Sequence, residues 1–131
     1  MRYDDLAVRH AHSRDASAIA PLFDAYRQFY GKAPDLALAE EFLRHRLQSG
    51  DSVILIAEAP TAGVGPIGFV QLYPTFSSLQ CNRAWILNNL FVAERARRCG
   101  VGEALMDAAT DSARLGSGSA TAVVEERCAR Y

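Results

Sequence analysis

Apolar residues in this chain follow two spacings, which predict strands in some stretches and helices in others. Strands are predicted where β-branched and aromatic residues run together, near residues 6–11, 52–59, 67–73 and 84–92. Helices are predicted where apolar positions recur every three or four residues, near 14–30, 35–49 and 100–115. Pro74 is expected to end the third strand. Because short connections join the middle strands, we expect them to be antiparallel within an α/β (α+β) layer.

The length and composition are those of one ordinary globular domain covering residues 1–131. Of the 131 residues, 50% are hydrophobic and 22% are charged, and the net charge is −1. This near-neutral balance gives no support for a nucleic-acid partner. No run of about 18 apolar residues exists and the first residues lack a signal-peptide core, so we expect a cytoplasmic protein without a membrane partner. Three widely spaced cysteines, Cys81, Cys99 and Cys128, predict neither a disulfide framework nor a metal site.

The most informative stretch is the turn between the fourth predicted strand and the third predicted helix. It contains R-R-C-G-V-G, Arg97 to Gly102. The first backbone N–H groups of a helix have no partner within it, and the helix dipole makes that end partly positive. Arg98, Cys99 and Gly100 include no strong capping acceptor, so these donors are left for a ligand. The glycines let a bulky anion reach the main chain and the arginines add charge, which predicts a phosphate or pyrophosphate site.

Two common phosphate loops do not fit this turn. A dinucleotide-binding turn needs a third glycine where Leu105 stands, and a nucleoside-triphosphate loop needs Gly-Lys-Ser/Thr, whereas the single lysine is Lys32. The turn instead fits the pattern Arg/Gln-x-x-Gly-x-Gly/Ala. With L-F-V before it and an apolar helix after it, it resembles the acetyl-CoA loop of the GNAT superfamily of N-acetyltransferases. An ordinary solvated arginine-rich loop is the alternative interpretation.

The resemblance covers roughly residues 5–116. The strand–helix–helix opening and the pair V-I-L-I-A-E and P-I-G-F-V-Q-L are similar to the family's first elements and middle strands. It implies a GNAT-like mixed, mostly antiparallel sheet flanked by helices. Residues 116–131 diverge from the family, whose members add a helix and a final hairpin there, so a C-terminally truncated fold is expected. Residues 120–125 could form one more strand.

The resemblance also implies a reaction and a cofactor. Family members transfer an acetyl group directly from acetyl-CoA to an amine, while loop amides hold the CoA pyrophosphate and the preceding strand bonds the pantetheine arm. The acceptor would be a primary amine of a small molecule or a protein. A catalytically silent acyl-CoA-binding or regulatory module, or a truncated family member without function, is the alternative. Carried onto this chain, the cofactor-binding residues are Leu90, Phe91, Val92, Arg97, Arg98, Cys99, Gly100, Val101, Gly102 and Glu103.

Candidate residues for the reaction lie on the middle strands and the first helices. Asn88 and Asn89 interrupt an apolar strand, where a buried amide needs partners. One could lie at the acetyl or substrate site, or both could bond the backbone at a bulge. Tyr73 is a third catalytic candidate. The family binds its acceptor near these elements, so the substrate-binding candidates are Tyr26, Tyr30, Tyr73 and Trp85. Phe29 could line the same pocket, but core packing is the preferred interpretation for Phe29 and Trp85.

The expected truncation predicts a homodimer. A strand over residues 120–125 would lie at a sheet edge, and exposed edges carry unpaired backbone groups that invite another chain. The missing elements would also uncover apolar surface on the third helix. Edge pairing, or exchange of the C-terminal segment across residues 116–119, would cover that side.

Overall fold

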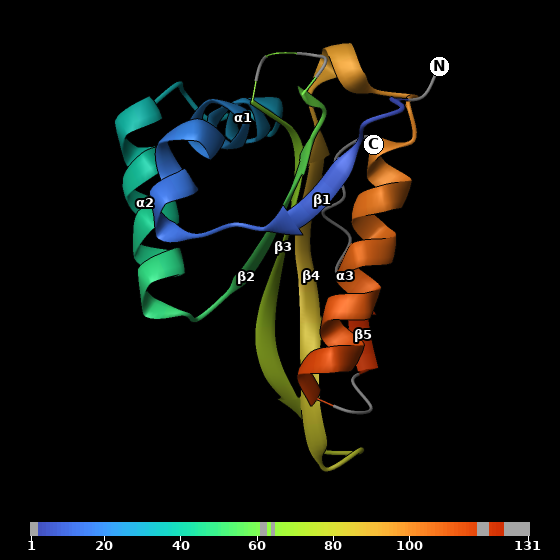
Figure 1. Ribbon diagram of the computed structural model, residues 1–131. Coiled ribbons are helices and arrows are strands. Elements are labelled where there is room, and N and C mark those ends of the chain that lie inside the picture. Colours follow the sequence, from blue (N-terminus) through green and yellow to red (C-terminus); the bar gives the residue numbers. More distant parts are fainter. Residues whose placement is uncertain (1–2, 61–62, 64, 118–120, 125–131) are drawn as a thin grey trace.

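The structure is a computed structural model, and it describes residues 3–60, 63, 65–117 and 121–124. Within these residues, five strands form one sheet in the order β1-β2-β3-β4-β5. Helices α1 and α2 cover one face of the sheet and α3 covers the other (Figure 1). The strands are β1 (Ala7–His10), β2 (Val53–Glu58), β3 (Pro66–Ser77), β4 (Asn82–Val92) and β5 (Thr121–Val124). The helices are α1 (Ala16–Phe29), α2 (Leu36–Ser49) and α3 (Val101–Ser117), with short 3-10 turns η1 (Ser13–Asp15) and η3 (Glu94–Ala96).

The predicted fold class is confirmed. Strands β1 to β4 pair antiparallel with their neighbours, as the short connections between the middle strands indicated. Strand β5 pairs parallel to β4, which makes the sheet mixed. It falls within the stretch 120–125 that the sequence allowed as a strand. The predicted absence of a further helix and hairpin concerns residues 125–131, which lie outside the described part of the chain.

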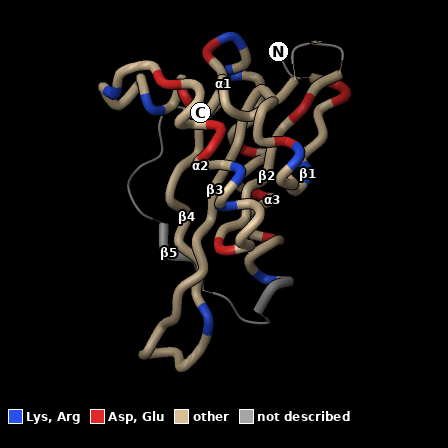
Figure 2. The backbone as a smooth tube through the Cα atoms, turned by 90° about the vertical axis from the view of Figure 1, so that its left-hand side faces the viewer, with Lys and Arg blue, Asp and Glu red and all other residues tan. Residues whose placement is uncertain are grey.

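Strand β3 is longer than predicted. Pro74 was expected to end it, but the strand continues to Ser77, so that prediction is wrong. Strand β2 pairs with β3 only as far as Leu72, whereas β4 follows β3 to Ser77. Beyond Leu72, β3 has one strand neighbour, and such an edge tolerates a proline without an N–H to donate. The β3–β4 pair therefore continues beyond the end of β2, with β5 beside β4 as far as Ala84, and its tip extends past the rest of the sheet (Figure 1) and carries little charge (Figure 2).

The alternation of side chains along β3 divides the core between the two faces. Phe69 faces α1, where its ring lies 5.6 Å from that of Phe23. Gly68 faces α3. A Cβ atom on Gly68 would lie 3.0 Å from both Leu105 Cδ1 and Val101 Cγ1, so this glycine lets the first turns of α3 pack directly on the strand. The position of the turn before α3 therefore depends on β3.

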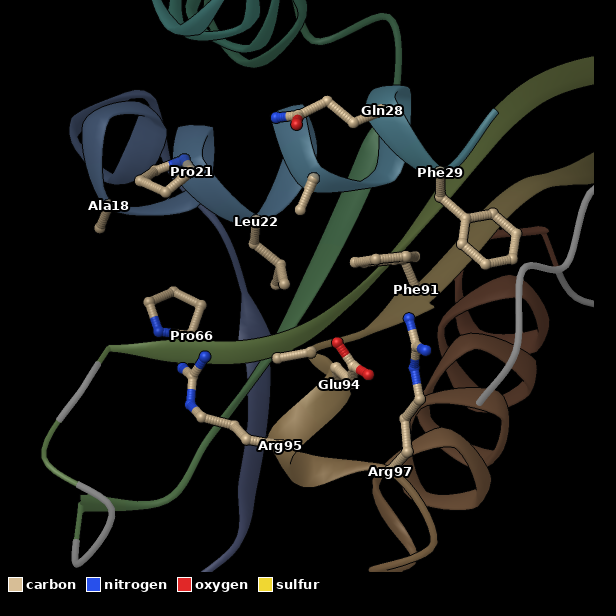
Figure 3. Close-up of a pocket in the computed structure, with 12 residues that line it drawn as sticks. Ala18, Pro21, Leu22, Gln28, Phe29, Pro66, Phe91, Glu94, Arg95 and Arg97 are labelled. Atoms are coloured by element: carbon tan, nitrogen blue, oxygen red, sulfur yellow. The ribbon is translucent and has the colours of Figure 1, made fainter. Parts of the chain in front are cut away.

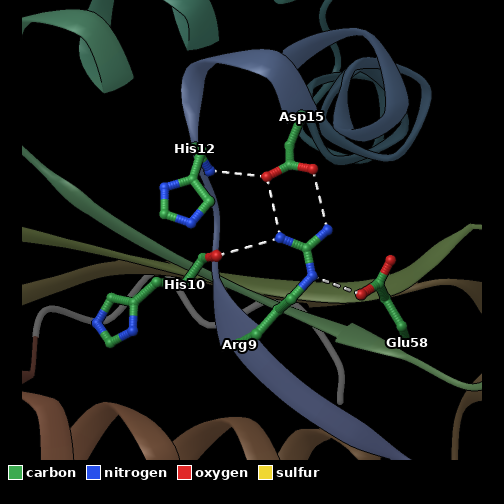
Figure 4. A network of polar contacts seen from close by, with 5 residues as sticks. All are labelled: Arg9, His10, His12, Asp15 and Glu58. Atoms are coloured by element: carbon green, nitrogen blue, oxygen red, sulfur yellow. Dashed lines mark hydrogen bonds and ion pairs between the residues drawn. The ribbon is translucent and has the colours of Figure 1, made fainter.

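An ionic network joins β1 to its neighbours (Figure 4). The Arg9 guanidinium donates two hydrogen bonds to Asp15, at 2.9 and 3.0 Å, and Nε donates to Glu58 at 2.8 Å. The backbone N–H of His12 also donates to Asp15, at 2.7 Å. The hydrogen bonds from Arg9 and from this N–H lower the pKa of Asp15 to about 2, against the opposing effect of burial. The network fixes the entry of the chain into α1 relative to β1 and β2.

Candidate active site

The turn between β4 and α3 presents a row of unused backbone donors. None of the described residues accepts a hydrogen bond from the N–H groups of residues 98–102. The first intrahelical bond runs from Ala104 N–H to the carbonyl of Gly100, at 3.1 Å, so the N–H groups ahead of it lie before or within the first turn of α3. These donors lie at the positive end of the helix dipole, which favours an anionic ligand.

The backbone of this turn is curled by two positive φ angles. Arg98 has φ 64° and Gly100 has φ 83°. A left-handed conformation is unfavourable for a residue with a Cβ, so Arg98 adopts it at a local cost, whereas Gly100 does so readily. Turns of this kind gather successive N–H groups into an anion-binding concavity. Cys99 contributes its backbone to the turn, and its thiol lies 3.5 Å from the carbonyl of Arg97.

Arg97 points away from these amides. Its Nε donates to the carbonyl of Val92 at 3.0 Å, and its guanidinium carbon lies 5.2 Å from the Phe91 ring centre and 5.9 Å from that of Phe29. The N–H of Ala93 bonds Ile67 on β3, so the Val92 carbonyl of the same peptide points away from β3. Arg97 therefore lies at the outer edge of β4, on the α1 side of the sheet.

The outer edge of β4 is covered over only part of its length. Strand β5 pairs with β4 between Ala84 and Leu87. From Asn88 to Val92, no strand in the described residues lies beside that edge. An extended ligand can therefore run along this segment towards the turn, with backbone donors and acceptors beside it.

Asn88 and Asn89 lie where the uncovered segment begins. Gln71 on β3 is opposite Asn89 and Leu72 is opposite Leu87, so Asn88 is the additional residue of a β-bulge. The Asn88 side-chain amide donates to Asn89 Oδ1 at 3.3 Å. Asn89 is buried, and its Nδ2 has no partner within the described structure. The structure thus has the bulge, but the hydrogen bond described there joins the two asparagine side chains and does not go to the backbone.

Comparisons with known proteins agree with this geometry. A model of the acetyltransferase (GNAT) family matches residues 19–127. An uncharacterized N-acetyltransferase of Bacillus subtilis, YhfO, is 54% identical over 106 residues, which are 81% of this chain and 69% of the relative. A probable acetyltransferase of Haemophilus influenzae is 38% identical over 101 residues, which are 77% of this chain and 68% of that protein. The crystal structure of a probable acetyltransferase that is 38% identical matches with a TM-score of 0.78. The match covers 89% of this chain and 78% of the chain in that structure.

The chain belongs to the GNAT acetyltransferase family. The match extends to residue 127, beyond the limit of 116 that the sequence resemblance suggested, and its range includes β5, which pairs parallel to β4. Arg97 to Gly102 matches the family pattern and is called the GNAT turn below; the uncovered segment of β4 leads to it through η3.

The structure brings together only some of the predicted acceptor residues. Tyr26 of α1 and Tyr73 of β3 share the face covered by α1 and α2, and the Tyr26 and Tyr30 rings lie 5.4 Å apart. Burial raises the pKa of Tyr73, so its hydroxyl remains protonated at neutral pH. Trp85 is opposite Pro74 and therefore faces α3, on the other side of the sheet.

Sequence reasoning missed a cavity beside the GNAT turn. It lies between α1 and residues 93–97, and Arg95 and Phe29 line it (Figure 3). Core packing was the preferred interpretation of Phe29, yet 47% of this residue is exposed. No helix in the described part of the chain is long and apolar enough to cross a membrane. Nor do the described residues contain a cluster of three or more His, Cys, Asp or Glu side chains that could hold a metal ion.

Proposed function

We propose that this GNAT protein transfers an acetyl group from acetyl-CoA directly to a primary amine of a small molecule or a protein. The observation that carries the proposal is the unused N–H groups of residues 98–102, which lie at the end of an uncovered strand edge. A pyrophosphate satisfies such donors, and an extended pantetheine arm matches the edge.

The cofactor would lie along one continuous track. Its pantetheine arm would follow Leu90 to Val92, and its pyrophosphate would lie over Arg98 to Gly102 and the first turn of α3, which includes Glu103. Phe91 would support the track from the α1 side, where its ring packs against Arg97. Arg97 would border the track through Nε, which bonds the Val92 carbonyl at the strand edge, and Arg98 would supply the mobile charge beside the pyrophosphate.

The reacting groups would meet near the bulge. Asn88 and Asn89 mark the far end of the track, where the thioester would lie, and amide side chains can hold the acetyl carbonyl by hydrogen bonds. Tyr73 and Tyr26 would line the acceptor side, with Tyr30 at its rim. A phenol that stays protonated can donate to the leaving thiolate, which makes Tyr73 the proposed acid.

The test combines turnover with binding. The protein should release CoA when acetyl-CoA and an accepting amine from a panel are present, and calorimetry should detect CoA binding without an amine. Gly102→Trp should abolish CoA binding, because Gly102 is buried at the start of α3 and an indole there would displace the neighbouring amides. The matched control is Asp111→Trp, which adds the same side chain on the exposed face of α3. Unchanged CoA affinity in Gly102→Trp refutes the loop assignment, whereas binding without turnover of any amine favours a silent acyl-CoA-binding module.

We also propose a homodimer. Strand β5 is the edge strand beyond β4 in the sheet order, and its outer backbone groups have no strand neighbour among the described residues. Edges of this kind pair readily with another chain. A second copy that pairs along β5 would extend the sheet and cover that side.

A further inference from the structure

A cavity of about 630 Å³ lies between α1 and the chain segment that follows β4. Its apolar surface comes from both sides: Leu22 and Ala25 project from α1, and Phe91 and Ala93 belong to β4 and the residue after it. Figure 3 shows the charged side chains of Glu94, Arg95 and Arg97 along the lower side of this space, facing α1. The volume and the mixture of apolar walls with few polar groups are typical of small-molecule sites.

Arg97 is held in a fixed orientation at one end of the cavity. The hydrogen bond from Nε to Val92 fixes the base of the guanidinium, and the rings of Phe91 and Phe29 lie against it at 5.2 and 5.9 Å. Its Nη groups have no acceptor among the described residues. A guanidinium whose position is already fixed loses little freedom when it binds an anion, and the Nη pair matches the two oxygens of a carboxylate.

A second cation stands at the other end. Arg95 lies near Pro66 in Figure 3, is exposed, and has no carboxylate partner in the described structure. Glu94 lies between the two arginines and is the one carboxylate that lines the cavity. The lining therefore carries a net positive charge beside an apolar wall.

We propose that this cavity is a second ligand site, which binds an organic anion with an apolar, preferably aromatic body. The carboxylate would lie against the Arg97 Nη groups with Arg95 as the second cation, and the body would pack on Leu22, Ala25 and the Phe91 ring. This site is separate from the amides of residues 98–102, because Arg98 and the residues after it do not line the cavity. Phe29 is a positioning residue: it acts by holding the Arg97 guanidinium.

Phenylacetate is the probe, and benzylamine is the control with the same ring and the opposite charge. In titrations of the 131-residue protein followed by NMR, phenylacetate should shift the amide signals of Leu22, Ala25, Ala93 and Arg95 in a saturable way. Benzylamine should bind at least about tenfold more weakly, as expected when a charge-assisted hydrogen bond is replaced by like-charge repulsion. Equal binding of the two compounds, or shifts confined to residues 98–102, would overturn the proposal.

The variants separate the contributions of the side chains. Arg95→Gln and Arg97→Gln should each weaken phenylacetate binding by about tenfold. Arg114→Gln, which removes an exposed arginine from the end of α3, should leave it unchanged. Phe29→Leu keeps an apolar side chain but removes the ring, so it should weaken binding in the parent protein and have no effect in the Arg97→Gln background. Additive effects of these two substitutions contradict the positioning role.

The proposal of a second site and the proposal of the cofactor track can be refuted independently. Phenylacetate should bind unchanged to Gly102→Trp, and Arg95→Gln should bind CoA as the parent protein does. Displacement of phenylacetate by CoA would make the cavity part of the cofactor track and overturn a separate site. Loss of CoA binding without loss of phenylacetate binding would refute the acetyltransferase proposal alone.

Discussion

Gly68→Ala tests whether close packing between β3 and α3 positions the GNAT turn. The new methyl group would lie 3.0 Å from Leu105 Cδ1, 3.0 Å from Val101 Cγ1 and 3.4 Å from the Phe91 carbonyl oxygen. Carbon atoms pack best at about 3.5–4.0 Å, so both side chains must retreat by roughly half an ångström or more. Val101 and Leu105 are both buried on the first two turns of α3, so the start of the helix must move with them.

The magnitude follows from two opposing effects. Overpacking of a filled core costs about 1–3 kcal/mol. Replacing glycine by alanine also restricts the unfolded chain, which stabilises the protein by about 0.4–1 kcal/mol. The difference between the middle values of the two ranges is a net loss of about 1 kcal/mol in the free energy of unfolding. Val101 belongs to the first turn of α3, so a shift of this turn should also lower CoA affinity. A loss of stability alone would not do so, because the affinity is measured on the folded protein.

Urea unfolding followed by the fluorescence of Trp85, the single buried tryptophan, measures the stability change. Calorimetry measures the affinity of the folded protein for CoA. Val101→Ala in the Gly68→Ala background is the control, because it removes the methyl carbon that the new Cβ meets. The double variant should be more stable than the sum of the two single losses predicts. An unchanged free energy of unfolding in Gly68→Ala, or strict additivity in the double variant, would refute the packing argument.

Two further predictions concern pH and assembly. The pKa of Asp15 is about 2 in the folded protein, below the ordinary 3.8, so its stabilisation is present above pH 4 and is lost as the pH falls towards 2. Asp15→Asn should lower the free energy of unfolding at pH 7 by about 1–2 kcal/mol, a value reduced to allow for solvent screening at the exposed Arg9. The substitution should also flatten the dependence of this free energy on pH between about 4 and 2. Urea unfolding at a series of acidic pH values measures both effects. Light scattering at micromolar concentration should give twice the monomer mass of 14.3 kDa, and a stable monomer counts against pairing along β5.

Local sequence signals were enough to predict the order of the elements and the GNAT turn. Apolar spacing identified the strands and helices because each element buries one or both faces, and the buried positions are apolar at the spacing of that element. The turn was visible for the same reason: Arg97 to Gly102 is contiguous, and the glycine at 100 adopts the positive φ that its position in the turn requires. The family resemblance suggested one more strand over 120–125, and β5 falls within that range, although its pairing with β4 was not predicted.

The features that the sequence did not predict depend on contacts between distant residues. The residues around Pro74 do not show that β2 stops pairing with β3 at Leu72. Pro74 was therefore predicted to end β3, although at that point the strand pairs on one side only and tolerates a proline. Likewise, Phe29 follows the apolar spacing of α1, but the residues opposite it are Phe91 and Arg97, and it stays half exposed beside a cavity. Pairing of residues far apart in the chain decides both outcomes.

The two adjacent arginines of the turn show how such contacts change an assignment. In the sequence, Arg97 and Arg98 look equivalent, and both were expected beside the phosphate. In the structure, Arg98 takes the left-handed conformation within the turn, whereas Arg97 is drawn to the α1 side by Val92, Phe91 and Phe29. Because the Nε bond to Val92 sits at the strand edge and the Nη groups line the cavity, a ligand in either place meets the same guanidinium. A substitution of Phe29 that releases the Arg97 side chain should therefore alter binding both in the cavity and along the uncovered edge of β4.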